Sequence, residues 1–379
     1  MRTSRRLEVL ILQATFAPWA SLPLHGLRRS YNNRTAIAFS SSSSNTLPQN
    51  VLEARCRITH VDVQPKSLIS HVHIPKTAGI SIQRELSKLF PGANIASWEE
   101  YYTEFVCQWP SGQVVTMLRN PRAQVFSQFL ECKYDAWGRE VTNGTAFPRS
   151  LSDELDFKAW LEHFAKLDST LGETNDFKCY NPCNMQTRYL ANGRSAIVRK
   201  DPKQRPFRHK HPVFPAHHAF ERRDVLPSPE EAISHLASMS WFGITELFHE
   251  SMCLLQYQAG GGGGQSKVPS ACRCSSNNRD DPGVGESHES HNVPMHDVNV
   301  LPVRTKELVD RLTDRDAVLY TQALLILMFR IRKMEHDAGV TVLCEKRLDM
   351  LRKELAYLPA ALEAINRSRT GPCSSEEGA

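Results

Sequence analysis

The sequence predicts an α/β domain whose sheet is mainly parallel and is flanked by helices. Short apolar runs with the length of buried strands alternate along the chain with longer segments in which apolar residues recur at a helical period. Two of these runs pass through a short loop into a helix, which is the unit from which parallel sheets are built. A chain of 379 residues that is 41% hydrophobic and 23% charged also has enough apolar side chains for a substantial core.

Two strand, loop and helix units open the predicted domain. The run "SLISHVHI" (67–74) has the apolar character of a buried strand, and in the helix "SIQRELSKLF" behind it Ile82 and Leu86 share one face. In the second unit "QVVTML" (113–118) is the strand, "RNP" is the turn, and "RAQVFSQFLECKY" is the helix, whose first turn suits Pro121.

The later elements are predicted from caps and periodicity. Ser228 as a cap and Pro229 as the first helical residue mark the start of a helix in "SPEEAISHLASM", which leads to a short strand, "WFGIT", and to the helix "ELFHESMCLLQYQ". The strongly apolar segment 313–336 predicts a long buried helix, and the amphipathic stretch from about 345 to 365 predicts one last helix. Helical patterns also occur in "DELDFKAWLEHFAKL" and "NMQTRYLA".

Composition divides the chain into a leader, one domain and a tail. Residues 1–65 lack a periodic apolar pattern, so we expect a targeting or signal-anchor segment followed by a disordered stem. Residues 66–365 form the single predicted domain, interrupted at about 259–296 by a Gly- and Ser-rich stretch that we expect to be a flexible surface insertion. We expect residues 366–379 to be a disordered tail.

The N-terminal residues predict a destination outside the cytosol. The run "LEVLILQATFAPWASLPL" is shorter and more interrupted than a spanning helix, which favours a signal peptide or a weak signal anchor. The expected location is the secretory pathway, and an uncleaved segment would hold the protein at the membrane. A plastid is the alternative, because residues 9–52 contain no acidic residue and "ATFAPWA" resembles the presequences of algal plastids.

Ten cysteines are many for a reducing compartment, and they are scattered rather than paired in C-x-x-C zinc knuckles. We therefore expect at least one disulfide and a secretory compartment. The first local pairs to expect are Cys179 with Cys183 and Cys272 with Cys274, although the sequence leaves the connectivity open. The alternative is that most of the cysteines are small buried hydrophobic residues.

The formal charge of +5 is too small to indicate a nucleic-acid partner. One segment, 199–223, is locally basic, with eight Lys or Arg, four His and only two acidic residues. Such a segment would attract an acidic ligand. A solvated, proline-rich loop is an equally good interpretation.

The loop in "HVHIPKTAGISIQ" has the residues of a phosphate site without the G-x-x-x-x-G-K-[ST] order of an NTPase. It follows a strand and opens a helix, where backbone N–H groups and the helix dipole favour an anion. Gly79 allows a close approach of the backbone, Lys76 supplies a positive charge, and Thr77 and Ser81 supply hydroxyls. The alternative is that Pro75 and the glycine only shape a tight turn.

A second candidate phosphate contact follows the second strand. "LRNPRAQVFSQF" places Arg119 at the carboxyl end of that strand and Ser127 on the helix behind it. A guanidinium and a hydroxyl bind a phosphate together, and ligands of open α/β sheets lie at the carboxyl ends of the strands. The two loops therefore predict a single ligand with two phosphate-type groups, although Arg119 alone would fit a structural salt bridge equally well.

Together these motifs resemble those of the sulfotransferases that use 3′-phosphoadenosine-5′-phosphosulfate (PAPS). "HIPKTAGISI" looks like their 5′-phosphosulfate loop, and "LRNPRAQVFSQF" looks like their 3′-phosphate motif. The variant is similar to the Golgi carbohydrate branch, the relatives of the hexuronic acid 2-O- and glucosamine 6-O-sulfotransferases. Later segments resemble further family blocks in the same order: "NMQTRYLA", "WFGITELFHESMCLL" and "NVLPVRTKELVDRLTDRDAVLY".

The resemblance implies a P-loop-like parallel sheet flanked by helices in a single sulfotransferase domain, which moves the sulfuryl group of PAPS to a hydroxyl of a glycan or polysaccharide without a metal. The residues that would surround the 5′-phosphosulfate are Lys76, Thr77, Ala78, Gly79, Ile80 and Ser81. Arg119 and Ser127 would hold the 3′-phosphate, and Arg188 would approach the nucleotide. Lys76 would also stabilise the charge of the leaving phosphate.

The general base is the part that the resemblance leaves open. The 2-O branch has a His between the two loops, whereas this chain has none there, so Glu99 and Glu100 in "NIASWEEYYTEF" are the candidates. Two adjacent glutamates are, however, often only a solvated face. His71 and His73 point to one face of their strand and are interpreted as core histidines. Gln124 stands where the family commonly carries an Arg, which removes one expected contact.

Two other classes of protein remain open. A P-loop nucleotide kinase would share the strand, loop and helix, but it should have the G-K-[ST] loop and a Walker B carboxylate for Mg²⁺, and the relevant loop shows neither. A catalytically inactive glycan- or nucleotide-binding relative would keep the fold without the chemistry. The joint presence of Lys76, Arg119 and Ser127 favours an active enzyme.

Overall fold

The computed structural model describes residues 58, 61, 66–108, 112–166, 177–191, 227–260, 268–274, 293–294 and 297–368. The expected targeting segment and nearly all of the stem, the basic segment 199–223, most of the insertion and nearly all of the tail lie outside the described residues. No helix in the described ranges is both long and apolar enough to cross a membrane.

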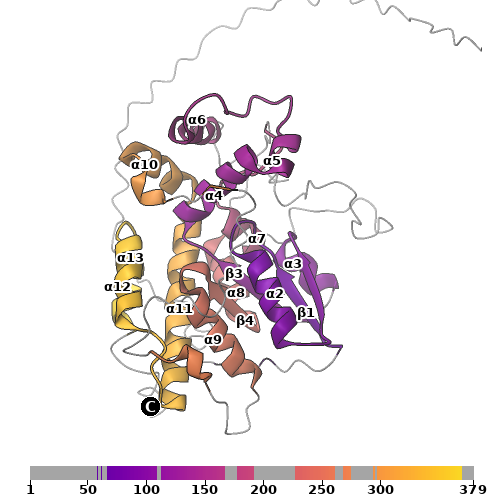
Figure 1. Ribbon diagram of the computed structural model, residues 1–379, viewed down its shortest axis with the longest axis vertical. Coiled ribbons are helices and arrows are strands. Elements are labelled where there is room, and N and C mark those ends of the chain that lie inside the picture. Colours follow the sequence, from indigo (N-terminus) through magenta and orange to yellow (C-terminus); the bar gives the residue numbers. More distant parts are fainter. Residues whose placement is uncertain are drawn as a thin grey trace, which may run out of the picture. The chain divides into compact units, whose positions relative to one another are not determined.

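A four-stranded, all-parallel sheet in the order β2-β1-β3-β4 forms the centre of the domain (Figure 1). The strands are β1 (Leu68–Val72), β2 (Asn94–Trp98), β3 (Gln113–Leu118) and β4 (Trp241–Ile244). The prediction of a parallel sheet flanked by helices is confirmed. Strand β2 was not predicted, because as an edge strand it is only partly buried and its sequence, "NIASW", lacks the continuous apolar run of a central strand.

Helices cover both faces of this sheet (Figure 1). They are α2 (Gly79–Leu89), α3 (Tyr102–Gln108), α4 (Pro121–Tyr134), α5 (Ala136–Val141), α6 (Asp153–Lys166), α7 (Met185–Ala191), α8 (Pro229–Ser238), α9 (Phe248–Ala259), α10 (Val303–Leu312), α11 (Asp314–Ala338), α12 (Glu345–Glu354) and α13 (Pro359–Arg367). Single 3-10 turns are η3 (Thr245–Leu247), η4 (Ser270–Cys272) and η5 (Val298–Val300).

The end of the chain differs from its prediction. The single helix expected at about 345–365 is two helices, α12 and α13, which extend to Arg367. The break has a local cause: Pro359 has no backbone N–H to donate to a preceding helix, and it occupies the first position of a new one.

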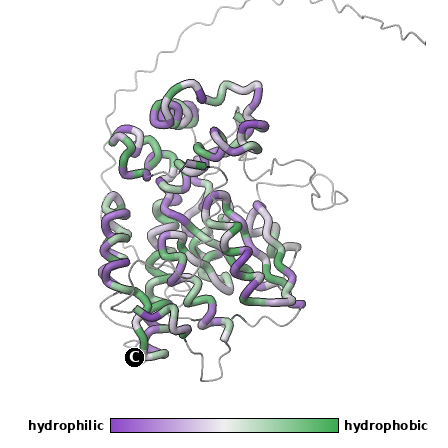
Figure 2. Tube along the Cα trace, viewed as in Figure 1, coloured by the Kyte–Doolittle hydropathy of each residue, from purple (hydrophilic) through white to green (hydrophobic). Residues whose placement is uncertain are grey.

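Alternating strand residues build two cores, one on each face of the sheet. Val72, Val114 and Leu118 belong to the larger core, and Ile69 and Val115 belong to the smaller core with α2 and α9. Strands β1, β3 and β4 are accordingly mostly buried, whereas α12 is mainly hydrophilic (Figure 2). A sheet buried on both faces leaves its strand ends as the place for polar chemistry.

Disulfides join segments that are far apart in the sequence: Cys132 to Cys179, Cys253 to Cys272 and Cys274 to Cys344. The expectation of at least one disulfide is confirmed, but both expected local pairs are wrong. Cys272 ends the turn η4 and bonds to Cys253 on α9, whereas Cys274 donates its backbone N–H to the carbonyl oxygen of Thr341 at 2.8 Å and bonds to the nearby Cys344. Cys179 lies against α4, where a Cα–Cα distance of 6.1 Å suits a bond to Cys132.

Candidate active site

Polar side chains follow directly on every strand of the sheet. His73 comes after β1, Glu99 after β2, Arg119 after β3, and Glu246 two residues after the end of β4. Because the strands are parallel, all these residues lie at the same edge of the sheet, where ligands of open α/β sheets bind. The candidate site is therefore this carboxyl edge.

The loop between β1 and α2 has an unusual backbone. Lys76 and Ala78 adopt left-handed conformations with φ of 65° and 66°, which costs non-glycine residues about 1–3 kcal/mol each. The Thr77 hydroxyl donates a 2.8 Å hydrogen bond to the carbonyl oxygen of Ile74, and this threonine is fully buried. The rest of the fold thus holds the loop in one shape, as is common at ligand sites.

Gly79 is required by a neighbouring ring rather than by its own backbone angles. A Cβ atom on this first residue of α2 would lie 1.9 Å from two ring atoms of His73. The imidazole therefore occupies the space over the start of α2 that any other residue would fill. His73 is thereby brought to the loop that contains Lys76.

Lys76 is paired with a carboxylate that the sequence did not single out. Its Nζ lies 3.4 Å from Oε2 of Glu131 on α4, and the two side chains are only 13% and 10% exposed. The hydroxyl of Tyr180 donates a 2.7 Å hydrogen bond to the same Oε2. Burial, and then the charge of Glu131, raises the pKa of Tyr180 well above its ordinary value, so the phenol keeps the proton that it donates.

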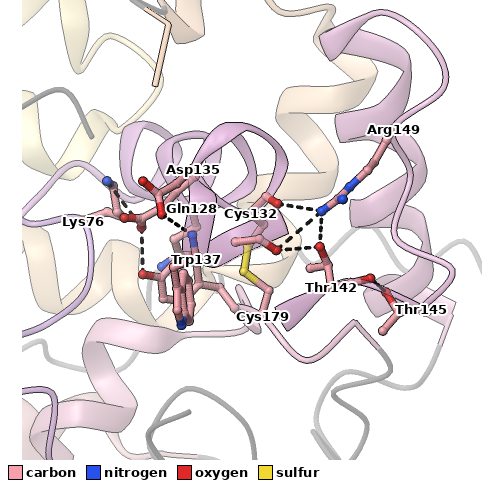
Figure 3. Close-up of a disulfide and its surroundings, with 12 residues drawn as sticks. Lys76, Gln128, Cys132, Asp135, Trp137, Thr142, Thr145, Arg149 and Cys179 are labelled. Carbon is pink, nitrogen blue, oxygen red and sulfur yellow. Dashed lines mark hydrogen bonds and ion pairs between the residues drawn. A yellow bond between two sulfur atoms is a disulfide. The ribbon is translucent and has the colours of Figure 1, made fainter. Parts of the chain in front are cut away.

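A disulfide fixes the carboxylate that pairs with this lysine and the tyrosine that donates to that carboxylate. Glu131 precedes Cys132 and Tyr180 follows Cys179, and these cysteines are bonded to each other. Figure 3 shows this bond with Lys76 among its surroundings. The carboxylate and the hydroxyl that donates to it are therefore held opposite each other by a covalent link.

One face of α4 turns toward the loop. The Nε2 of Gln124 donates a 2.9 Å hydrogen bond to the carbonyl oxygen of Pro75, and Glu131 pairs with Lys76 two turns further along. Ser127 lies between them at helical spacing and is 3% exposed. Gln124 thus anchors the loop through the backbone of Pro75.

The second motif contacts the first directly. The Nη1 of Arg119 donates a 3.1 Å hydrogen bond to the carbonyl oxygen of Lys76. The side-chain amide of Gln186 accepts from the backbone N–H of Arg119 at 2.9 Å and donates to its carbonyl oxygen at 2.8 Å. The structure thus places the half-buried guanidinium against the loop.

Two carboxylates lie behind that guanidinium. Glu246 accepts hydrogen bonds from the backbone N–H of Asn120 at 2.9 Å and from the Tyr320 hydroxyl at 3.0 Å. Burial, and then the nearby charge of Glu354, raises the pKa of Glu246 to about 7. Burial lowers the pKa of Arg119, and these two carboxylates oppose that effect.

The two histidines of β1 and its loop have different environments. His71 is fully buried, its Nδ1 lies 2.8 Å from the Ser97 hydroxyl, and burial followed by the charge of His73 lowers its pKa well below the ordinary value. It is a core histidine, as expected. His73 stacks on it at 5.5 Å between centroids but is half buried, and its Nδ1 lies 3.9 Å from Oε1 of Glu99. The interpretation of His73 as a core residue is therefore wrong.

The remaining predicted residues lie in different surroundings. Ile80 and Ser81 are half buried in the first turn of α2, and Glu100 is half buried directly after Glu99. Arg188 on α7 is 1% exposed and donates a 2.8 Å hydrogen bond to the carbonyl oxygen of Asn181, so here it belongs to the core.

Sequence reasoning missed Glu131, Tyr180 and Glu246. Two of them could have been identified from their positions in the sequence. Glu131 stands one helical turn after Ser127, and Glu246 follows directly on the predicted strand "WFGIT". Tyr180 had none, because only the disulfide and the packing of its loop bring it to the carboxylate.

A potential metal-ligand group lies elsewhere, on α9 and η4. Ligand atoms of His249, Cys253 and Cys272 lie within 4.8 Å of one another. The two cysteines form a disulfide with each other and so have no thiolate to offer a metal.

No protein-family model matches the sequence, and no curated protein matches it either. The chain's own motifs and the arrangement of the carboxyl edge are therefore the features that indicate its function.

Proposed function

We propose that the chain is a PAPS-dependent sulfotransferase that moves a sulfuryl group to a hydroxyl of a glycan or polysaccharide. The observation that carries the proposal is the 3.1 Å hydrogen bond from Arg119 to the backbone of Lys76. It joins the 5′-phosphosulfate motif to the 3′-phosphate motif at one edge of the sheet. A donor with phosphate groups on two positions of one ribose requires such a juxtaposition.

The residues of the edge fit a phosphosulfate. The loop opens α2, whose N-terminal N–H groups and dipole favour an anion, and Gly79 is the first residue of that helix. Lys76 supplies the positive charge, and Ser81 supplies a hydroxyl in the first turn. Arg119 and Ser127 are the pair for the 3′-phosphate, since α4 turns the serine toward the same loop.

The proposed reaction is an in-line displacement at sulfur. The oxygen of the acceptor hydroxyl forms a bond to sulfur while the bond between sulfur and the phosphate oxygen breaks, and adenosine 3′,5′-bisphosphate leaves. Lys76 stabilises the charge that develops on the leaving phosphate. The proton of the acceptor goes to a carboxylate, for which Glu99 is the better candidate than Glu100, because it follows directly on β2 and faces His73.

Two alternative functions account for fewer of these contacts. In a P-loop kinase the hydroxyl next to the lysine serves a metal ion, whereas the Thr77 hydroxyl donates inside the loop and is buried. An inactive nucleotide-binding relative would keep Lys76 and Arg119 for the phosphates but would have no use for a carboxylate such as Glu99 at the same edge. The disulfides favour the secretory pathway and the Golgi over the cytosol, with the plastid as the alternative location.

The test is a transfer assay with labelled PAPS against a panel of polysaccharides. We expect transfer by the wild type to at least one of them, and losses of more than about a hundredfold in Lys76→Ala and Arg119→Ala, since each removes a charge that acts in the transition state. Glu99→Gln should be impaired and Glu100→Gln should not. A wild-type protein that neither transfers label nor binds adenosine 3′,5′-bisphosphate contradicts the proposal.

A further inference from the structure

We infer that Glu131 competes with the sulfuryl donor for Lys76, and that Tyr180 limits the strength of this competition. The inference concerns the regulation of donor binding and rests on the proposed function. It assigns a role to Glu131 and Tyr180, which no motif indicates.

The carboxylate that pairs with Lys76 has no other role in building the loop. Nζ of Lys76 and Oε2 of Glu131 are 3.4 Å apart in surroundings where both side chains are almost covered. The loop keeps its shape through other contacts, namely the hydrogen bonds of Thr77 to Ile74 and of Gln124 to Pro75. Glu131 therefore acts on the lysine charge rather than on the backbone.

An anion bound by the loop needs that same charge. The N-terminus of α2 offers backbone N–H groups, but Lys76 is the side-chain cation of the loop. When the donor binds, Nζ must turn from the carboxylate toward the phosphosulfate, or the carboxylate must share it. Glu131 thus lowers donor affinity by its attraction for Lys76.

Tyr180 acts in the opposite direction. Its hydroxyl donates 2.7 Å to the same Oε2 that faces Lys76, and so it withdraws part of the negative charge from the lysine. The bond between Cys132 and Cys179 keeps this hydroxyl in place, because each cysteine adjoins one of the two partners. The Tyr180 side chain is buried and packs against Trp137 at 5.4 Å between centroids, with the two rings tilted at 51°, which restricts it further.

The inference makes predictions of opposite sign for two conservative substitutions. In Glu131→Gln the competitor loses its charge, so adenosine 3′,5′-bisphosphate should bind on the order of tenfold more tightly. In Tyr180→Phe the carboxylate recovers its full charge, so the same ligand should bind about threefold more weakly. If Glu131 and Tyr180 only maintained the local structure, both substitutions would weaken binding of the ligand.

The experiment is calorimetric titration of the full chain with adenosine 3′,5′-bisphosphate, with thermal unfolding of each variant as a folding check. Glu85→Gln is the matched control, because Glu85 pairs with Lys88 at 2.8 Å on α2 without contacting the loop. It should change affinity by less than about twofold. In a Lys76→Ala background the effect of Glu131→Gln should shrink markedly, since the competition needs the lysine.

The outcomes separate this inference from the proposed function. Wild-type binding together with unchanged or weaker binding in folded Glu131→Gln overturns the inference and leaves the proposed function standing. An effect of Glu131→Gln that is undiminished in the Lys76→Ala background also overturns it. Failure of the wild type to bind the ligand at all overturns both.

Discussion

The contact between His73 and Gly79 gives the sharpest prediction about the loop. A Cβ atom at residue 79 would lie 1.9 Å from the His73 ring, whereas unstrained carbon contacts are about 3.5–4.0 Å. Gly79→Ala must therefore displace the ring, which is held by its stack on His71 and its pairing with Glu99. Overpacking of this kind costs about 1–3 kcal/mol, and the better helix propensity of alanine returns up to roughly 1 kcal/mol.

The net expectation for Gly79→Ala is a loss of about 1–2 kcal/mol in the free energy of unfolding. In a His73→Ala background the obstructing ring is gone, so the same change should be neutral or stabilising by up to roughly 1 kcal/mol. Urea unfolding of the wild type, both single variants and the double variant measures this reversal of sign.

Gly138→Ala is the matched control. A Cβ there would lie 2.2 Å from the backbone oxygen of Glu131, so the clash does not involve His73. Its cost should be the same with and without the histidine ring. The reasoning is refuted if Gly79→Ala costs as much in the His73→Ala background as in the wild type.

Further predictions concern two buried charged groups. The pKa of Glu246 is raised from its ordinary 4.5 to about 7, so its protonated form contributes stability that is full below about pH 4.5 and is lost as the pH rises through about 7. Urea unfolding at pH 5 and pH 8 should show that the stability of the wild type relative to Glu246→Gln falls by on the order of 2 kcal/mol over this interval, and a constant difference would contradict the assignment. The buried Nζ of Lys133 lies 2.7 Å from Asp153 and 2.8 Å from Asp156. Lys133→Ala should lower the free energy of unfolding by about 3–5 kcal/mol, because it removes the cation that pairs with the buried carboxylate of Asp156. Lys158→Ala, which removes a partly exposed pair with Glu162, should change the free energy of unfolding by less than about 0.5 kcal/mol, and equal losses in the two variants would rule out this reasoning.

The elements that sequence could predict are those whose pattern is local. The strands that became β1, β3 and β4 are continuous apolar runs, and the starts of α4 and α8 carry proline after a capping residue, Asn120 and Ser228. The edge strand β2 escaped prediction because its burial is only partial. Arg119 and Lys76 could be assigned to one edge because parallel strand ends must meet there.

The parts that could not be predicted depend on packing between distant segments. The partner of Cys179 is 47 residues away, and the adjacent Tyr180 reaches Glu131 only through that link. His73 has the alternation of a core residue in the sequence, but it follows the last residue of β1 and turns toward the start of α2. Arg188 has the type of a ligand contact, and only the fold shows that it is buried.

The central claim is that the two loops hold one ligand with two phosphate groups, and its most direct test is the preference for a 3′-phosphate. Calorimetric titration should show that the wild type binds adenosine 3′,5′-bisphosphate at least about tenfold more tightly than adenosine 5′-monophosphate, and that Arg119→Ala removes most of this preference while Lys76→Ala weakens both ligands. Equal affinity of the wild type for the two nucleotides, or binding of neither, would contradict the claim.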